Sequence, residues 1–439
     1  MSYSSHCLLG IKRRARLRFV IARTLVVCIA AVLLATTTKT VAGDWPSWRG
    51  PSADGVSNET GMVTKWDAKT NVKWKAPLPD QGNSTPIVSG DRVFVTCAEK
   101  KGSVRSLICF NRNTGDQLWK QSVKFAGEEE THRTNPYCAA SAVTDGKVVV
   151  VWHGSAGVHA YSLDGKLKWS KDIGMFNHIW GNAASPVILD GQVLISAGPG
   201  VRHVLYSLSV TDGSITWQTK LTKVQQAFDL QKKNFQGSWC SPVVIRSGGA
   251  KQIVLTLPLE MVGFNTSDGK RVWSCDGLSR LAYNQPLFGK GLIVAMSGYQ
   301  GTAFAMKLPG ANERGNLTSS HRKWVVKKNK QRVGSGVIVG DHVFILDEPG
   351  IMRCIDLKTG ESQWQARLGG RTWSSMVYAD SKLWVNSEAG VTHILEANTK
   401  ELKVVAQNKI DELTRASPVF SNGDLFIRTY QHLYCIGSK

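Results

Sequence analysis

The sequence predicts an all-β fold built from repeats, and two recurring features support this prediction. Eight times along the 439 residues, an apolar run meets a tight turn and restarts as a second apolar run. Such pairs are typical of β-hairpins. A Trp follows most of these hairpins, and successive Trp residues lie 40 to 56 positions apart, within the repeat length of four-stranded blades. Together these features predict an eight-bladed β-propeller of four-stranded antiparallel blades over residues 71–439.

Each repeat begins with the hairpin, which supplies the two inner strands of a blade. The predicted turns lie at residues 90–91, 145–146, 190–191, 248–249, 289–291, 340–341, 380–381 and 422–423. They are rich in Gly, Asp and Asn, which tolerate the positive φ angles of tight turns.

The outer part of each repeat is a third strand, a turn with Gly, and a fourth strand that carries the Trp. The clearest copies are Cys109–Trp119 and Cys354–Trp364, and the seventh unit, 394–404, has no Trp. The predicted structural Trp residues are Trp74, Trp119, Trp169, Trp217, Trp273, Trp324 and Trp364. Burial of about 150–250 Å² of indole at about 25 cal/mol per Å² stabilises each blade junction by a few kcal/mol.

The two ends of the repeat array predict how the ring closes. The last unit, 417–436, supplies only three strands, whereas an unpaired strand at 72–76 precedes the first hairpin. We expect the N-terminal and C-terminal strands to share the last blade, which leaves no terminal edge strand exposed. The segment 309–322, rich in Gly, Asn and Ser, is predicted to be a protruding loop in the fifth blade.

The outer-strand motif also carries a family resemblance. The small-x-Asp-x-x-Thr-Gly-x-x-x-Trp pattern at Cys354–Trp364, with its variant at Cys109–Trp119, resembles the tryptophan-docking motif of quinoprotein-like (PQQ-like) β-propellers. Asp44–Pro51 resembles a lead-in of secreted bacterial members. That family includes PQQ-dependent alcohol dehydrogenases and BamB-like assembly proteins of the cell envelope. PQQ is therefore a cofactor implied by the resemblance alone.

The chain begins with a leader. A basic cluster, 12–23, precedes the apolar run 25–35, and small residues at 41–43 suit cleavage. This pattern predicts a signal peptide at 1–43 and a lead-in segment at 44–70, without distinguishing Sec from twin-arginine export. The apolar run is shorter than the roughly 20 residues of a membrane span. We expect an exported monomer with no transmembrane segment in the mature chain, in the periplasm or outside, peripheral to the outer membrane.

The net charge limits the classes of partner that we expect. The formal net charge is +21. This charge suits envelope proteins or an anionic glycan as partners, and it is also consistent with a cationic surface that contacts only solvent. Nucleic acid is not expected as a partner outside the cytoplasm.

The chain has nine cysteines, of which seven follow the leader, and it contains no C-x-x-C motif. Most resemble small core residues, although Cys97 and Cys109 are close enough in the first blade for a disulfide to be considered.

The segments that connect one blade to the next are predicted to gather at the axial mouth, where corresponding positions form a ring. The predicted ligand-binding residues are Arg133, Asn135, Trp180, Asn182, Trp239, Tyr283, Asn284, Arg332, Arg371, Trp373 and Arg415. Guanidinium groups suit carboxylates and sulfates, and indole faces suit sugars. The ring thus predicts a site for an anionic saccharide or small anion, unless these residues merely cap blade ends and plug the channel.

Catalytic signatures are missing from the same segments. They contain no carboxylate, whereas the resemblance implies a Ca²⁺-bound quinone held by carboxylate and amide ligands in the dehydrogenases. We find no metal-ligand motif, and we assign no catalytic residue and no metal ligand. The sequence therefore favours a non-catalytic scaffold or binding module of the cell envelope, with an anion or saccharide binder and a PQQ-dependent oxidoreductase as alternatives.

Overall fold

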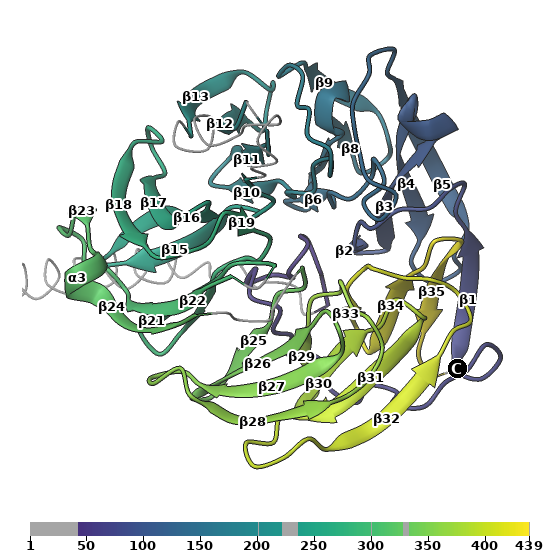
Figure 1. Cartoon of the computed structure of the whole chain (residues 1–439). Helices are drawn as coiled ribbons and strands as arrows, with labels where there is room; N and C mark the ends of the chain where they lie inside the picture. Colours follow the sequence, from purple (N-terminus) through teal and green to yellow (C-terminus); the bar gives the residue numbers. More distant parts are fainter. Residues whose placement is uncertain (1–42, 201, 222–235, 300, 328–332, 439) are drawn as a thin grey trace, which may run out of the picture. The chain divides into compact units, whose positions relative to one another are not determined.

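The computed structural model describes residues 43–200, 202–221, 236–299, 301–327 and 333–438. The compact unit that begins at Gly43 is an eight-bladed β-propeller of four-stranded antiparallel blades, which confirms the predicted fold (Figure 1). The predicted signal peptide lies outside these described residues except for Gly43. Within the described ranges, no helix has both the length and the apolar character needed to cross a membrane.

The blades follow one another in sequence order around the axis. Blade 1 contains β2 (Ile87–Ser89), β3 (Arg92–Glu99), β4 (Val104–Asn111) and β5 (Gln117–Lys124). Blade 2 contains β6 (Val143–Thr144), β7 (Val148–Trp152), β8 (Val158–Ser162) and β9 (Leu167–Lys171). Blade 3 contains β10 (Val187–Leu189), β11 (Gln192–Ala197), β12 (Val204–Ser209) and β13 (Ile215–Lys220). Blade 4 contains β15 (Val243–Ser247), β16 (Ala250–Leu257), β17 (Glu260–Asn265) and β18 (Arg271–Asp276).

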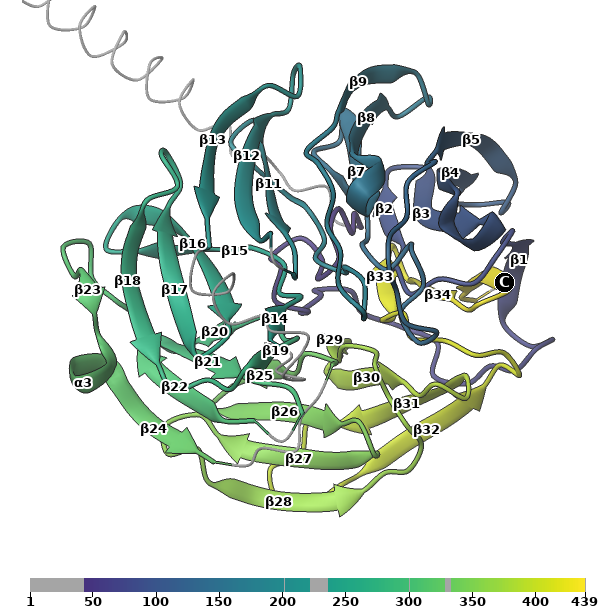
Figure 2. The same ribbon diagram turned by 45° about the horizontal axis from the view of Figure 1, so that its top comes forward.

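The second half of the ring repeats this order. Blade 5 contains β20 (Leu287–Gly289), β21 (Leu292–Met296), β22 (Ala303–Lys307) and β24 (Arg322–Val326). Blade 6 contains β25 (Val337–Val339), β26 (His342–Asp347), β27 (Ile351–Asp356) and β28 (Ser362–Arg367). Blade 7 contains β29 (Val377–Ala379), β30 (Lys382–Asn386), β31 (Val391–Glu396) and β32 (Val404–Lys409). The tilted view shows inner strands such as β25 and β29 nearest the axis and outer strands such as β28 and β32 at the rim (Figure 2).

Blade 8 closes the ring in the predicted way. It combines β33 (Val419–Ser421), β34 (Asp424–Arg428) and β35 (His432–Ile436) with the N-terminal β1 (Val72–Pro77), which pairs antiparallel with β35. Two ion pairs hold β1 in place, from Lys73 to Asp424 at 2.6 Å and from Lys75 to Glu412 at 3.2 Å. Both termini of the propeller are therefore paired within one sheet.

Six of the predicted Trp residues bridge one blade to the next. Each donates its indole N–H to a backbone carbonyl of the following blade, at 2.8 to 3.1 Å, and the donors are Trp74, Trp119, Trp169, Trp217, Trp324 and Trp364. The turn glycine beneath the ring is required, since a Cβ on Gly115 would lie 2.7 Å from the Trp74 ring. Trp273 differs because its N–H is donated to Gln252 of its own blade, at 2.6 Å.

The junction between blades 7 and 8 lacks this bridging Trp. In β32 the corresponding position is Ala406, which is paired with Ile394. The lead-in fills the space instead, because Trp66 is buried and stacks on Trp384, with centroids 6.3 Å apart and planes at 10°. Its backbone N–H is donated to the Asn408 side chain at 3.0 Å. A Trp from outside the repeats thus occupies the junction that the repeat itself leaves empty.

Hydroxyl residues at the start of the inner strands link neighbouring blades at the axis. The backbone N–H of one blade is donated to the hydroxyl of the next at 2.8 to 3.1 Å. These bonds run from Thr85 to Ser141, Ser141 to Ser185, Ser185 to Ser241, Gln285 to Ser335, Ser335 to Ser375, Ser375 to Ser417, and Ser417 back to Thr85. We call this set the hydroxyl collar.

Two expectations from the sequence are wrong. The segment 309–322 does not simply protrude, because β23 (Gly315–Asn316) pairs in parallel with β18 of blade 4, and the short helix α3 (Thr318–His321) follows it. The Cys97–Cys109 disulfide is absent, since both thiols are free and the two residues occupy different register positions on β3 and β4.

Candidate functional site: the axial cup

The connecting segments of all eight blades meet at one end of the propeller axis and enclose a cavity of about 290 Å³. We call this cavity the axial cup, and we call the side of the propeller on which it opens the cup face. Its aromatic lining residues are Trp48, Trp180, Trp239, Tyr283, Tyr299 and Trp373. Its main polar lining residues are Asn83, His132, Thr134, Asn135, Glu348 and Arg415. The structure therefore brings six of the eleven predicted ring residues to one cavity.

Three of the aromatic rings form a continuous arc. Trp180 and Trp239 have centroids 5.9 Å apart, and Trp239 and Tyr283 have centroids 5.0 Å apart. Trp239 is fixed from outside the cup by its N–H, which is donated to the Gly181 carbonyl at 2.8 Å, and by His178, which meets it edge-on at 5.1 Å. Burial lowers the pKa of His178 to about 4, which keeps this ring neutral at ordinary pH.

Arg415 is the predicted ring arginine that reaches the cup, and it is engaged. Its Nε lies 3.1 Å from a Glu388 oxygen, and its Nη1 is donated to the Thr134 carbonyl at 2.9 Å. Its guanidinium lies 4.7 Å from the centre of the Trp373 ring. The indole N–H of Trp373 is in turn donated to Glu348 at 3.2 Å. The guanidinium is therefore partly neutralised before any ligand arrives.

The other predicted arginines do not form a ring around the cup. Arg133 is exposed and lines a separate hollow of about 220 Å³, beside Tyr137 and Lys101. Arg371 is exposed and does not line the cup, and Arg332 lies outside the described residues. A four-arginine anion site is consequently not present among the described residues.

The expectation of a mouth free of carboxylates is wrong. Glu348 lines the cup, and Glu388 pairs with Arg415 beside it. Both follow the second strand of their blades, in the hairpins β26–β27 and β30–β31. These hairpins open on the same side of the propeller as the connecting segments, because successive strands of a blade run antiparallel. Sequence reasoning considered only the connecting segments and so missed them.

The predicted asparagines brace the connecting segments from behind. The Asn135 amide is donated to the Trp180 carbonyl at 2.7 Å, and the Asn284 amide is donated to the Gly334 carbonyl at 2.6 Å. Asn182 instead donates to Glu129 at 3.0 Å. These amides hold one segment against the next, and of the three only Asn135 also lines the cup.

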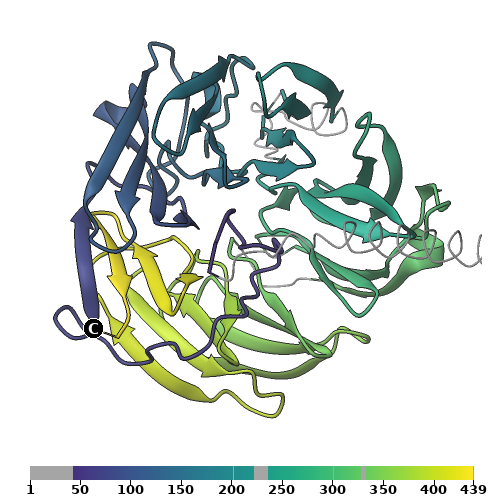
Figure 3. The same cartoon turned by 180° about the vertical axis from the view of Figure 1, so that it is seen from behind.

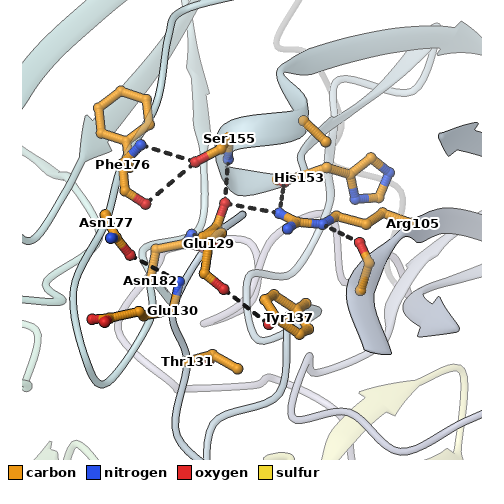
Figure 4. A network of polar contacts seen from close by, with 12 residues as sticks. Arg105, Glu129, Glu130, Thr131, Tyr137, His153, Ser155, Phe176, Asn177 and Asn182 are labelled. Atoms are coloured by element: carbon orange, nitrogen blue, oxygen red, sulfur yellow. Dashed lines mark hydrogen bonds and ion pairs between the residues drawn. The ribbon is translucent and has the colours of Figure 1, made fainter. Parts of the chain in front are cut away.

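A buried ion pair anchors the segment that supplies His132 and Thr134 to the cup (Figure 4). Arg105 of β4 lies 3.1 Å from Glu129, and each side chain is only 1% exposed. Glu129 also accepts the Ser155 N–H at 2.8 Å, while its own carbonyl accepts the Tyr137 hydroxyl at 2.9 Å. The network ties this segment to blades 1 and 2, which fixes the position of the lining residues it carries.

The lead-in closes the inner end of the cup. From behind, it runs from the rim beside blade 8 to the axis (Figure 3). Trp45 pairs with Val88 of blade 1, and Arg49 donates to the carbonyls of Gly336 and Met376 at 2.7 Å, next to the collar. Burial lowers the pKa of Arg49 to about 10, against the opposing charge of Asp54. Trp48 thus lies at the end of the cup that faces the channel, and sequence reasoning did not predict this role.

The described lining residues do not fit PQQ. PQQ is a tricarboxylate, and the one Arg or Lys among these lining residues is Arg415, already paired with Glu388, with Glu348 in the same cavity. The described parts of the chain hold no cluster of three His, Cys, Asp or Glu residues that would bind a metal ion. The cup is suited to binding through aromatic faces and mixed hydrogen-bonding groups.

Comparison with known proteins places the chain in a family. The model of the family described as outer membrane protein assembly factor BamB matches residues 54–201 and 103–366. The outer membrane protein assembly factor BamB of Moranella endobia is 21% identical over 359 residues, which cover 79% of this chain and 82% of that protein.

Solved structures share the fold. BamB from Moraxella catarrhalis gives a TM-score of 0.55 at 14% identity, covering 86% of this chain and 97% of that chain. The quinohemoprotein alcohol dehydrogenase from Comamonas testosteroni gives a TM-score of 0.68 at 10% identity, covering 91% of this chain and 81% of that chain. Identities this low establish the fold alone. The family match, however, covers well over half of the 439 residues, and the chain therefore belongs to the family of outer membrane protein assembly factor BamB.

Proposed function

We propose that this protein is a non-catalytic scaffold of the cell envelope that binds protein partners through its cup face. The family match, which names an assembly factor, is the observation that carries this proposal. In this view the mature chain is exported, acts as a monomer in the periplasm or outside, and stays peripheral to the outer membrane. The propeller supplies a rigid support, and its loops supply the contacts.

The distribution of exposed apolar residues supports the cup face as the contact surface. Four exposed apolar residues lie in described loops, namely Met175, Leu259, Tyr299 and Leu413. Each is either in a connection between blades or in a hairpin between second and third strands, and both kinds of loop open on the cup face. The other exposed large apolar residues lie on outer strands. Large apolar residues on a loop surface favour association when a partner covers them.

The proposal predicts a capture experiment with two matched variants. The mature chain, residues 44–439, is immobilised and exposed to solubilised native envelopes, and the recovered proteins are quantified by mass spectrometry. We expect components of outer-membrane protein assembly to be enriched. The double variant Leu259→Asp/Leu413→Asp should lower their recovery about fivefold or more, since loss of about 1 kcal/mol of binding free energy corresponds to that factor.

The control places the same chemistry elsewhere on the surface. Leu118→Asp/Ile215→Asp alters two exposed residues of the outer strands β5 and β13 and should retain full recovery. Recovery of no assembly component, or an equal loss in both double variants, would contradict the proposed scaffold role. Size-exclusion chromatography with light scattering of the same preparation tests the monomer.

A further inference from the structure

The lining of the axial cup indicates which kind of ligand it can bind, independently of the scaffold role. We propose that the cup binds a ring of an uncharged sugar, as a free oligosaccharide or as the end of a neutral glycan. This proposal replaces the anionic ligand that the sequence predicted, because the charges that surround the cup differ from those expected.

The size and shape of the cup favour one or two sugar rings. Its volume is about 290 Å³, at the lower end of the roughly 300–1,000 Å³ of pockets for drug-sized ligands. Trp48 lines the cup, and the adjacent Arg49 is held next to the hydroxyl collar, so the lead-in covers the inner end and we expect a ligand to enter and leave through the mouth. An extended peptide that has to pass through such a site does not fit, whereas the end of a glycan does.

The aromatic surfaces provide the faces on which a sugar ring packs. Trp180, Trp239 and Tyr283 form the arc on one side, and Tyr299 stands at the mouth. Tyr299 is 74% exposed, the most exposed of the large apolar and aromatic residues that the structure describes. The C–H groups of a pyranose present a flat apolar face of the size of an indole, and burial of that face supplies the hydrophobic part of the binding energy.

The polar groups in the cup include both donors and acceptors, which matches hydroxyl groups. Asn83 supplies an amide, and His132 and Thr134 lie side by side with a 2.7 Å contact between Nδ1 and Oγ1. Glu348 accepts one bond from Trp373, and a carboxylate accepts up to about four. A sugar hydroxyl both donates and accepts, so it can pair with each of these groups.

Charges of both signs lie around the cup, and each is already engaged. Arg415 is paired with Glu388, and Glu348 accepts the indole N–H of Trp373. An anion would meet the Glu348 carboxylate without an unpaired cation among the described lining residues. An organic cation would meet the Arg415 guanidinium, which already covers the face of Trp373. An uncharged ligand avoids both penalties, which is why we assign the cup to a neutral sugar.

The test is a titration followed by calorimetry and by tryptophan fluorescence, since four of the lining residues are Trp. The probes are maltotriose, cellotriose and chitotriose as neutral sugars and trigalacturonate as the anionic one. We expect at least one neutral sugar to bind with a Kd below about 1 mM. Tyr299→Ala should weaken it about fivefold, and Glu348→Gln about tenfold through loss of charge-assisted hydrogen bonds.

The matched control is Glu361→Gln, which makes the same change at an exposed turn of blade 6 and should leave the Kd unchanged. Failure of every neutral sugar to bind up to about 10 mM overturns the proposal, provided that the propeller is folded by circular dichroism. The proposal is also overturned if trigalacturonate binds and its affinity increases in Glu348→Gln. A third contrary result is a neutral-sugar Kd that is the same in the native protein, Tyr299→Ala and Glu348→Gln.

Co-sedimentation with the matching insoluble polysaccharide distinguishes the two sources of the sugar. If the protein sediments with the polysaccharide, the ligand is the end of a glycan. If it binds the free trisaccharide but does not sediment, the ligand is a soluble sugar. The Leu259→Asp/Leu413→Asp variant should still bind the sugar, because neither residue lines the cup. The scaffold role and the sugar site can therefore be disproved independently of each other.

Discussion

Removal of the Trp66 side chain should destabilise the whole propeller, although this residue lies outside the repeats. In the structure Trp66 occupies the junction between blades 7 and 8, where the repeat has Ala406 instead of Trp. It is 5% exposed and stacked on Trp384. Trp66→Ala leaves a cavity between the two blades that close the ring.

The magnitude follows from the buried area. An indole buries about 150–250 Å², which at about 25 cal/mol per Å² gives roughly 4–6 kcal/mol as an upper bound. Measured Trp or Phe to Ala changes in cores cost about 3–5 kcal/mol. We therefore expect the free energy of unfolding to fall by about 3–4 kcal/mol, since the lead-in can partly collapse into the space.

Urea denaturation monitored by far-UV circular dichroism measures this loss, and a second variant tests its location. Ala406→Trp restores the missing repeat residue. In the native protein it should overpack the junction and cost about 1–3 kcal/mol, whereas in the Trp66→Ala background it should recover at least about 1 kcal/mol. A loss below about 1 kcal/mol for Trp66→Ala, or the same effect of Ala406→Trp in both backgrounds, would refute this assignment of the junction.

The remaining predictions concern the buried polar groups. Glu129→Gln leaves Arg105 buried without its carboxylate partner and should cost about 3 kcal/mol in urea unfolding; a loss near zero would show that the ion pair does not anchor its loop. Burial lowers the pKa of His203 to about 3 and of His393 to about 4. Below about pH 6.5 the unfolded chain binds protons that the folded chain does not, so the free energy of unfolding should fall by up to about 1.4 kcal/mol per pH unit for each ring between pH 6.5 and 4; a urea midpoint that stays constant from pH 7 to 5 contradicts this. Burial raises the pKa of Cys240 to about 11, and all seven described cysteines are buried, so Ellman's reagent should label fewer than two thiols within minutes in native buffer and all seven in urea.

The fold could be predicted from the sequence because its determinants are local. The Gly turn and the Trp lie within eleven residues of each other in copies such as Cys354–Trp364, and the three-strand last unit pointed to closure by β1. The filling of the blade 7 to 8 junction was not predictable in this way. Trp66 and Ala406 are far apart in sequence, and nothing local to either shows that one replaces the missing bulk at the other.

The candidate site was predicted only in part, for the same reason. The aromatic arc from Trp180 to Tyr283 lies in the connecting segments, which topology places at the mouth. Glu348 and Glu388 lie in other loops, and their proximity to Arg415 depends on side-chain directions that a repeat pattern does not specify. In place of the predicted ring of arginines, the described part of the cup therefore has one arginine, Arg415, with the two carboxylates of Glu348 and Glu388 from the neighbouring hairpins.

The position of the lead-in has a consequence for the order of folding. Residues 44–77 are made before blade 1, yet several of their partners, in blades 6, 7 and 8, are made last. Closure of loops of 287 and 342 residues, from Arg49 to Gly336 and from Trp66 to Asn408, comes late and slowly. Contacts with blade 1, such as the pairing of Trp45 with Val88, can form early, whereas the ring stays open until the last blade is made.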